Sequence, residues 1–145
     1  MLEALSSSGD SLNNLPSLTP DELFKAKSHL YKGLEIIANQ LNNLRQGIYD
    51  ALQAASELNE AWLEVNKCRV YTETIVDFEE CLQPAMGFIF DAKCMIEHLA
   101  ALHMGITRQG FVSITGCLDE ATGLIGMVLG ELESWDKTEQ EEDAV

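Results

Sequence analysis

The sequence has little positive charge. Nine of its 145 residues are lysine or arginine and 24 are aspartate or glutamate, which gives a formal net charge of −15. This excess argues against direct binding to nucleic acid or to an anionic membrane, because both are negatively charged. Proteins with a basic surface remain open as partners.

The chain also lacks the patterns of secreted, membrane-spanning and disulfide-stabilised proteins. No run of about 18 uncharged apolar residues occurs, and the first residues lack the basic and long apolar segments of a secretory signal. The cysteines form no C-x-x-C pair, so we expect reduced thiols rather than a disulfide framework or a zinc knuckle. We therefore expect a soluble, cytoplasmic protein.

Apolar residues at helical spacing are present over most of the chain. The hydrophobic content is 46%, which is enough for one core in a chain of this length. Apolar residues in alternating steps of four and three, as in a coiled-coil seam, run from Leu30 to Val65 and recur in two later segments. They predict an all-α, antiparallel bundle of three long amphipathic helices, over about 20–68, 72–104 and 108–136.

Local signals refine this prediction. Thr19 is expected to cap the first helix and Pro20 to be its first residue, and Pro84 is expected to kink the second helix. The first helix would be roughly 70 Å long, so a break near Gly47, giving four helices, is the alternative. The predicted organisation is a flexible N-terminal arm at 1–18, a single helical-bundle domain at 19–137 and an acidic tail at 138–145.

The predicted third helix carries a stripe of glycines opposite its core seam. Gly116, Gly123 and Gly130 follow one another at intervals of seven, although an exposed glycine inside a helix costs roughly 1 kcal/mol relative to alanine. Because small residues let another helix approach closely, this face is predicted to bind a partner. The alternatives are a face covered by the chain's own helices, or glycines tolerated on an exposed surface. The predicted partner-binding residues are Val112, Gly116, Asp119, Gly123, Gly126, Met127 and Gly130.

The short segment HLYKG, His29 to Gly33, resembles the H-x-x-K-G core of histidine phosphotransfer domains, which are helical bundles. The resemblance implies that His29 would carry a phosphoryl group, that Lys32 would offset its charge and that Gly33 would leave room for a receiver domain. It covers five of 145 residues, and Leu34 stands where such domains usually have a small residue. The alternative is an ordinary exposed histidine.

Other arrangements of reactive side chains are incomplete. Asp91, Cys94 and His98 would share one face of the second helix as metal ligands, but no second cluster supplies further ligands, so we interpret this face as solvated. Cys94 or Cys117 as a nucleophile lacks a glycine elbow or a phosphate-binding loop beside it. We therefore expect no catalytic residue, no metal and no cofactor.

These patterns predict a non-enzymatic protein that binds another protein through helix–helix contacts and an acidic surface, as an adaptor, chaperone or inhibitor. We expect it to form a homo-oligomer, such as a homodimer, and not to bind nucleic acid or membrane directly. One alternative is an acidic inhibitor that imitates nucleic acid and occupies a basic groove, as some phage counter-defence proteins do. The other is phosphotransfer through His29.

Overall fold

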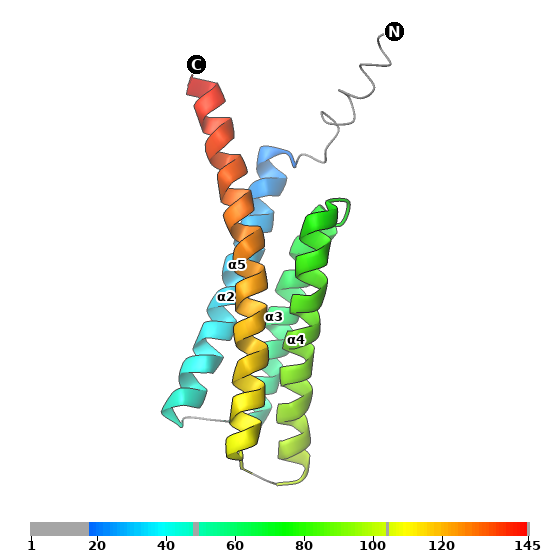
Figure 1. The fold of residues 1–145 in the computed structure, drawn as a ribbon, viewed down its shortest axis with the longest axis vertical. Coiled ribbons are helices and arrows are strands. Elements are labelled where there is room, and N and C mark those ends of the chain that lie inside the picture. Colours follow the sequence, from blue (N-terminus) through cyan, green and yellow to red (C-terminus); the bar gives the residue numbers. More distant parts are fainter. Residues whose placement is uncertain (1–17, 48–49, 104, 145) are drawn as a thin grey trace.

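The computed structural model describes residues 18–47, 50–103 and 105–144, with the backbone alone for 136–144. In these ranges the chain is all-helical, with no strand, and forms a bundle of four helices (Figure 1). They are α2 (Pro20–Gln46), α3 (Ala51–Thr72), α4 (Val76–Ala101) and α5 (Arg108–Ala144). The predicted arm at 1–18 lies outside the described residues except for Leu18, which packs against the core.

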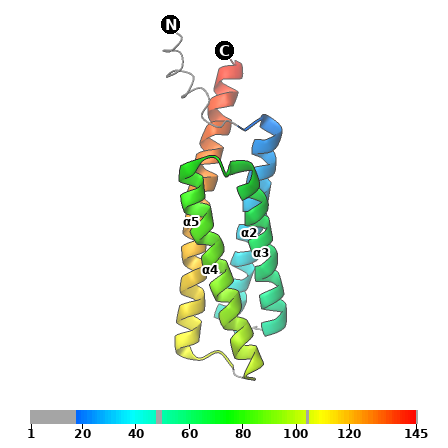
Figure 2. The ribbon, with the colours of Figure 1, turned by 90° about the vertical axis from the view of Figure 1, so that its right-hand side faces the viewer.

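The helices lie side by side around one core, as the two views in Figures 1 and 2 show. α2 packs against α3 and α5, and α4 packs against the same two helices. Each helix contributes fully buried side chains from its apolar seam, and burial of these seams is the main favourable term for folding. The largest fully buried apolar side chains are Leu30, Ile37, Leu58, Leu82, Ile89, Ile96, Ile114, Leu118, Ile125, Leu132 and Val65.

The first predicted helix, over 20–68, is corrected to two helices. α2 ends at Gln46, and Gly47 takes a left-handed conformation with φ of 75°, from which its N–H contacts the carbonyls of Asn43 and Leu44. Glycine adopts this conformation without a Cβ clash. Asp50 then caps α3, because its side chain accepts a hydrogen bond from the N–H of Gln53.

The remaining helix ends differ from the predicted ones by a few residues. The predicted capping box at Thr19 is present, with reciprocal hydrogen bonds between Thr19 and Glu22. α4 begins at Val76 rather than 72, ends at Ala101 rather than 104, and includes Pro84 within a continuous helix. α5 continues past the predicted end at 136 to Ala144, through a segment rich in good helix formers.

Candidate functional site

The outer face of α5 carries the predicted partner-binding residues, and the described parts of the chain do not cover their glycines. Gly116, Gly123, Gly126 and Gly130 are exposed, and an added Cβ at any of them would have no neighbouring heavy atom within 4 Å. Val112 and Met127 flank these glycines and are 61% and 65% exposed. The described helices therefore leave this face open, which answers one of the alternatives raised by the sequence.

Polar contacts join α5 to α2 along one edge of this face. Asp119 lies 3.8 Å from Arg45, and both side chains are more than half exposed, so this ion pair contributes little to stability. The hydroxyl of Tyr31 donates a hydrogen bond to the carboxylate of Glu133. Asp119, which was predicted to bind a partner, is thus engaged by a weak contact that water or a partner can replace.

A groove with an apolar floor lies on the other side of this face, between α4 and α5. It has a volume of about 330 Å³, and its floor includes Phe78 and Trp135, whose ring centroids are 5.3 Å apart. Asp77 and Glu131 supply two carboxylates to its lining, and Met127 belongs both to the groove and to the predicted partner-binding face. The full lining consists of Ile75, Asp77, Phe78, Cys81, Met127, Val128, Glu131 and Trp135.

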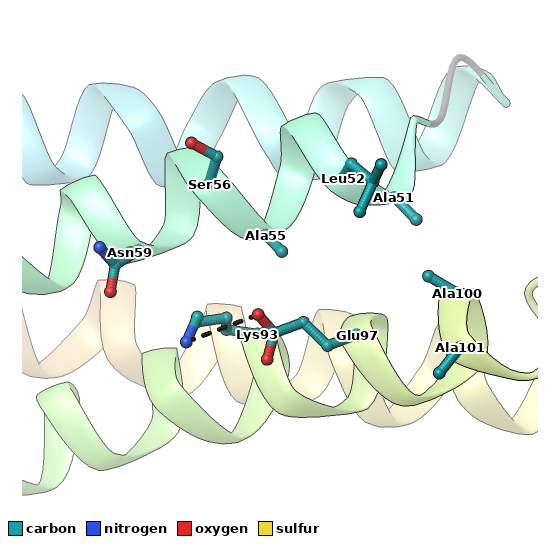
Figure 3. Close-up of a pocket in the computed structure, with 9 residues that line it drawn as sticks. All are labelled: Ala51, Leu52, Ala55, Ser56, Asn59, Lys93, Glu97, Ala100 and Ala101. Atoms are coloured by element: carbon teal, nitrogen blue, oxygen red, sulfur yellow. Dashed lines mark ion pairs between the residues drawn. The ribbon is translucent and has the colours of Figure 1, made fainter.

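A larger open groove, of about 560 Å³, lies between α3 and α4 (Figure 3). Small side chains line much of it, among them Ala51 and Ala55 on α3 and Ala100 and Ala101 on α4. Its charged groups are Lys93 and Glu97, which form an ion pair on α4 with a separation of 3.7 Å. This lining offers no pair of groups suited to acid–base or nucleophilic chemistry.

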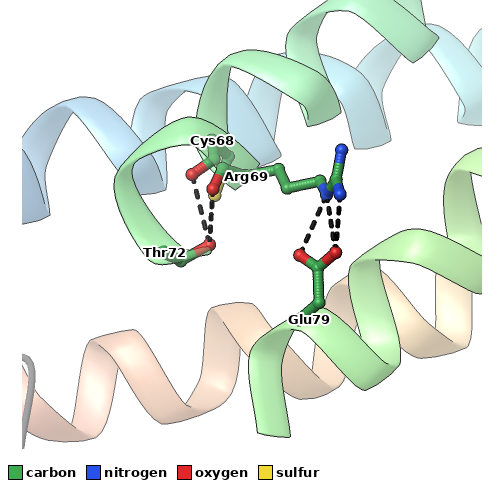
Figure 4. A network of polar contacts seen from close by, with 4 residues as sticks. All are labelled: Cys68, Arg69, Thr72 and Glu79. Carbon is green, nitrogen blue, oxygen red and sulfur yellow. Dashed lines mark hydrogen bonds and ion pairs between the residues drawn. The ribbon is translucent and has the colours of Figure 1, made fainter. Parts of the chain in front are cut away.

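The turn between α3 and α4 positions the residues at one end of the α4–α5 groove. Arg69 at the end of α3 makes a two-pronged contact with Glu79 on α4, with three N···O distances of 2.7 to 2.9 Å (Figure 4). This contact holds the pKa of Glu79 below its ordinary value. Thr72 donates a hydrogen bond to the carbonyl of Cys68 in the last turn of α3. The turn that leads to Ile75 is therefore fixed by side chains on both helices.

The residues of the phosphotransfer pattern surround a buried carboxylate that sequence reasoning missed. Glu64 on α3 is 2% exposed, and its Oε1 lies 2.8 Å from Nδ1 of His29. Its Oε2 lies 3.3 Å from Nζ of Lys67 and 3.7 Å from Nζ of Lys32. Burial acts to raise the pKa of Glu64, but His29, Lys67 and Lys32 together hold it below its ordinary value.

The contacts of Gly33 differ from those that the phosphotransfer resemblance implies. Gly33 is buried, and a Cβ added there would lie 3.4 Å from Cγ2 of Val65 and 3.7 Å from the carbonyl oxygen of Ala61. α3 therefore occupies the space that a receiver domain would need beside Gly33. In this structure His29 forms a hydrogen bond with the buried Glu64, and the more exposed Lys32 lies 3.7 Å from the same carboxylate.

The predicted metal-ligating and nucleophilic residues do not assemble into a reactive site. Within the described residues, no group of three or more His, Cys, Asp or Glu side chains is placed to hold a metal ion. Asp91, Cys94 and His98 therefore do not form such a group. Cys94 and His98 instead line a cavity of about 410 Å³ between α4 and α5. Burial raises the pKa of Cys117, with Asp91 and Glu120 adding to the effect, so its thiol is protonated at neutral pH and is a weak nucleophile.

The segment 108–135 of α5 is long and apolar enough to cross a membrane, by length and composition alone. A core helix meets the same criteria, and a third of the most apolar window in this segment is buried in the bundle. Asp119 and Glu120 lie inside the segment, and an aspartate at the centre of a membrane helix costs roughly 3 kcal/mol. The core seam and the glycines account for its apolar character.

Comparison of the chain with protein-family models, with curated proteins and with solved structures finds no significant match.

Proposed function

We propose that this protein is a non-enzymatic binding protein that receives a helix of another protein on the outer face of α5, and so acts as an adaptor, chaperone or inhibitor. One observation supports this proposal above the others: the glycines of this face have no neighbouring atoms within 4 Å of an added Cβ. A helix of a partner packed on this face would fill that space.

The energetic cost of these glycines supports a role outside the isolated chain. Each glycine inside a helix costs roughly 0.5–1 kcal/mol relative to alanine, so four of them cost roughly 2–4 kcal/mol, a sizeable part of the 5–15 kcal/mol of a typical domain. Alanine would fit at each of the four positions. The isolated chain therefore gains no stability from glycine at these positions. Glycine would instead favour the complex, because it allows a partner helix to approach α5 closely.

The flanking side chains fit such a contact. Helix axes pack 8–10 Å apart, and small residues at the contact favour the short end of this range. Val112, one turn before Gly116, and Met127, one turn after Gly123, are more than half exposed. A partner helix lying over the glycines would bury both of them, which adds apolar area to the contact.

The course of the chain leaves this face accessible. We infer that successive helices run antiparallel, because the connections at 47–50, 73–75 and 102–107 are short. In this arrangement α5 is the last helix of the bundle and packs between α2 and α4, both of which it contacts. Its outer side then points away from the other three helices along its whole described length.

The test compares two open glycines on different helices. Gly123→Trp would obstruct the α5 face, whereas Gly87→Trp places the same side chain at an equally open position on α4. We expect the unmodified protein and the Gly87→Trp variant to recover the same stoichiometric partner from a lysate of the source cells, identified by mass spectrometry. The Gly123→Trp variant is expected to lose it. Equal recovery by both variants, with equal thermal stability, would contradict the proposal.

A further inference from the structure

The chemistry of the α4–α5 groove restricts the kind of helix that fits beside the glycines. Its floor is apolar, with Phe78, Val128 and Trp135, and the two charged residues that line it are Asp77 and Glu131. No lysine or arginine is among its described lining residues. At about 330 Å³ it is at the lower end of the range for ligand pockets, about 300–1,000 Å³. The groove therefore fits one or two apolar side chains of a partner, with a cationic side chain beside them that can pair with Asp77 and Glu131.

The charges along α5 are of one sign over the same stretch. Between Arg108 and Lys137 the sequence contains no lysine or arginine, whereas Asp119, Glu120 and Glu131 all fall within it. An exposed ion pair joins Arg45 on α2 to Asp119 in this stretch. A partner that packs on the glycines would therefore contact the carboxylates of Asp119, Glu120 and Glu131, which lie on both sides of them.

This pattern disfavours two occupants that the chain itself could supply. A second copy packed face to face would bring Asp119, Glu120 and Glu131 against the same carboxylates, and like charges across an interface are costly. The chain's own residues 1–17 contain Glu3 and Asp10 and no lysine or arginine. Neither occupant complements the charge of the groove.

We propose that the partner of this face is an amphipathic helix with a stripe of small or apolar residues and with arginine or lysine along its flanks. This inference depends on the binding function proposed above and specifies the chemistry of the partner. The small stripe packs on the glycines of α5, one apolar side chain enters the groove beside Trp135, and a flanking cation pairs with Asp77 and Glu131. Arginine suits this position because its fork geometry matches a carboxylate.

The test uses pairs of labelled synthetic helical peptides of about 20 residues, a length at which isolated helices become stable. All carry a small-residue stripe and differ in their apolar anchor, leucine, phenylalanine or tryptophan. In each pair one peptide has arginines on its flanks and the other has glutamates at the same positions. Binding to the full chain is measured by fluorescence anisotropy. We expect at least one arginine peptide to bind and its glutamate twin to bind at least tenfold more weakly, because charges across the interface then repel.

Charge-reversal variants locate the contact. The Asp77→Lys/Glu131→Lys double variant is expected to weaken binding of the arginine peptide about tenfold. The Glu35→Lys/Glu60→Lys control makes the same change in net charge at exposed positions on α2 and α3, and is expected to change binding less than threefold. Equal loss in both double variants would show a nonspecific charge effect and overturn the inference. So would equal binding of the two peptide types, or failure of every arginine peptide to bind.

The remaining outcomes separate this inference from the binding function itself. In a Trp62→Phe background, where Trp135 is the one tryptophan, a change of emission with protein concentration, without peptide, would place a second copy in the groove and overturn the inference. If Leu12→Ser/Leu15→Ser alters that emission, the chain's own N-terminal segment occupies the groove, which also overturns it. Partner recovery that is lost in Gly123→Trp but unaffected by Asp77→Lys/Glu131→Lys would leave the binding function standing and refute the basic partner alone.

Discussion

Replacing the three evenly spaced glycines of α5 by alanine tests whether its outer face is free in the isolated protein. Gly116, Gly123 and Gly130 have no neighbouring heavy atom within 4 Å of an added Cβ, so the triple alanine variant introduces no clash. Each replacement gains about 0.5–1 kcal/mol from helix propensity, which gives roughly 2 kcal/mol in total. For a chain of this size the gain corresponds to a rise in Tm of roughly 6 °C.

Thermal and urea unfolding followed by circular dichroism, at two protein concentrations, measure this gain. An unchanged or lower stability would contradict this prediction, because it would mean that the glycines are packed against another group in the purified protein. A Tm that rises with protein concentration would identify that group as part of a second copy. The same variant is expected to bind its partner more weakly than the unmodified protein, since the added methyl groups hold the two helices further apart.

Three further predictions concern the interior. Glu64 has a folded-state pKa below its ordinary value of 4.5. Its contribution to stability is therefore present above pH 4.5 and is lost as the pH falls through the folded-state pKa. The Glu64→Gln variant should accordingly show a shallower loss of stability, measured by urea unfolding, below pH 4.5. Gly33→Leu should lower the free energy of unfolding by about 2 kcal/mol through overpacking against Val65, measured by urea unfolding with Gly87→Leu as its control. The pKa of Cys68 is raised to about 12 by burial, so mass spectrometry should show no alkylation of Cys68 in the native protein at pH 8 and full alkylation in urea.

The positions of the helices follow from the sequence because their signals are local. The spacing of apolar residues identifies the residues that the bundle buries, such as Leu30, Leu118 and Ile125. The break at Gly47 was an alternative rather than the main prediction, because a heptad pattern continues across it and a single glycine inside a helix is often tolerated. The turn chemistry that decides the matter involves Gly47 and Asp50 together.

The buried carboxylate and the grooves could not be predicted from one sequence. Glu64 stands one residue before the seam residue Val65, and its burial depends on how closely α3 approaches Gly33 of α2. The α4–α5 groove joins Asp77 to Glu131, which are far apart in the sequence and meet only because α4 packs against α5. The position of the α5 glycines opposite the core seam was predicted, because a helical wheel needs no knowledge of neighbouring helices. Whether the chain's own helices cover them was left open, and the described helices do not.

The most direct test of the central claim places a photo-crosslinking amino acid at Val112, beside the glycines of α5, in the cells from which the protein comes. Leu52 on α3 is the control position, because it is also a large and exposed apolar residue. The account predicts that irradiation links position 112, and not position 52, to one other protein, with loss of the product in the Gly123→Trp background. Equal products at both positions, no product at 112, or products that contain only further copies of this chain would contradict it.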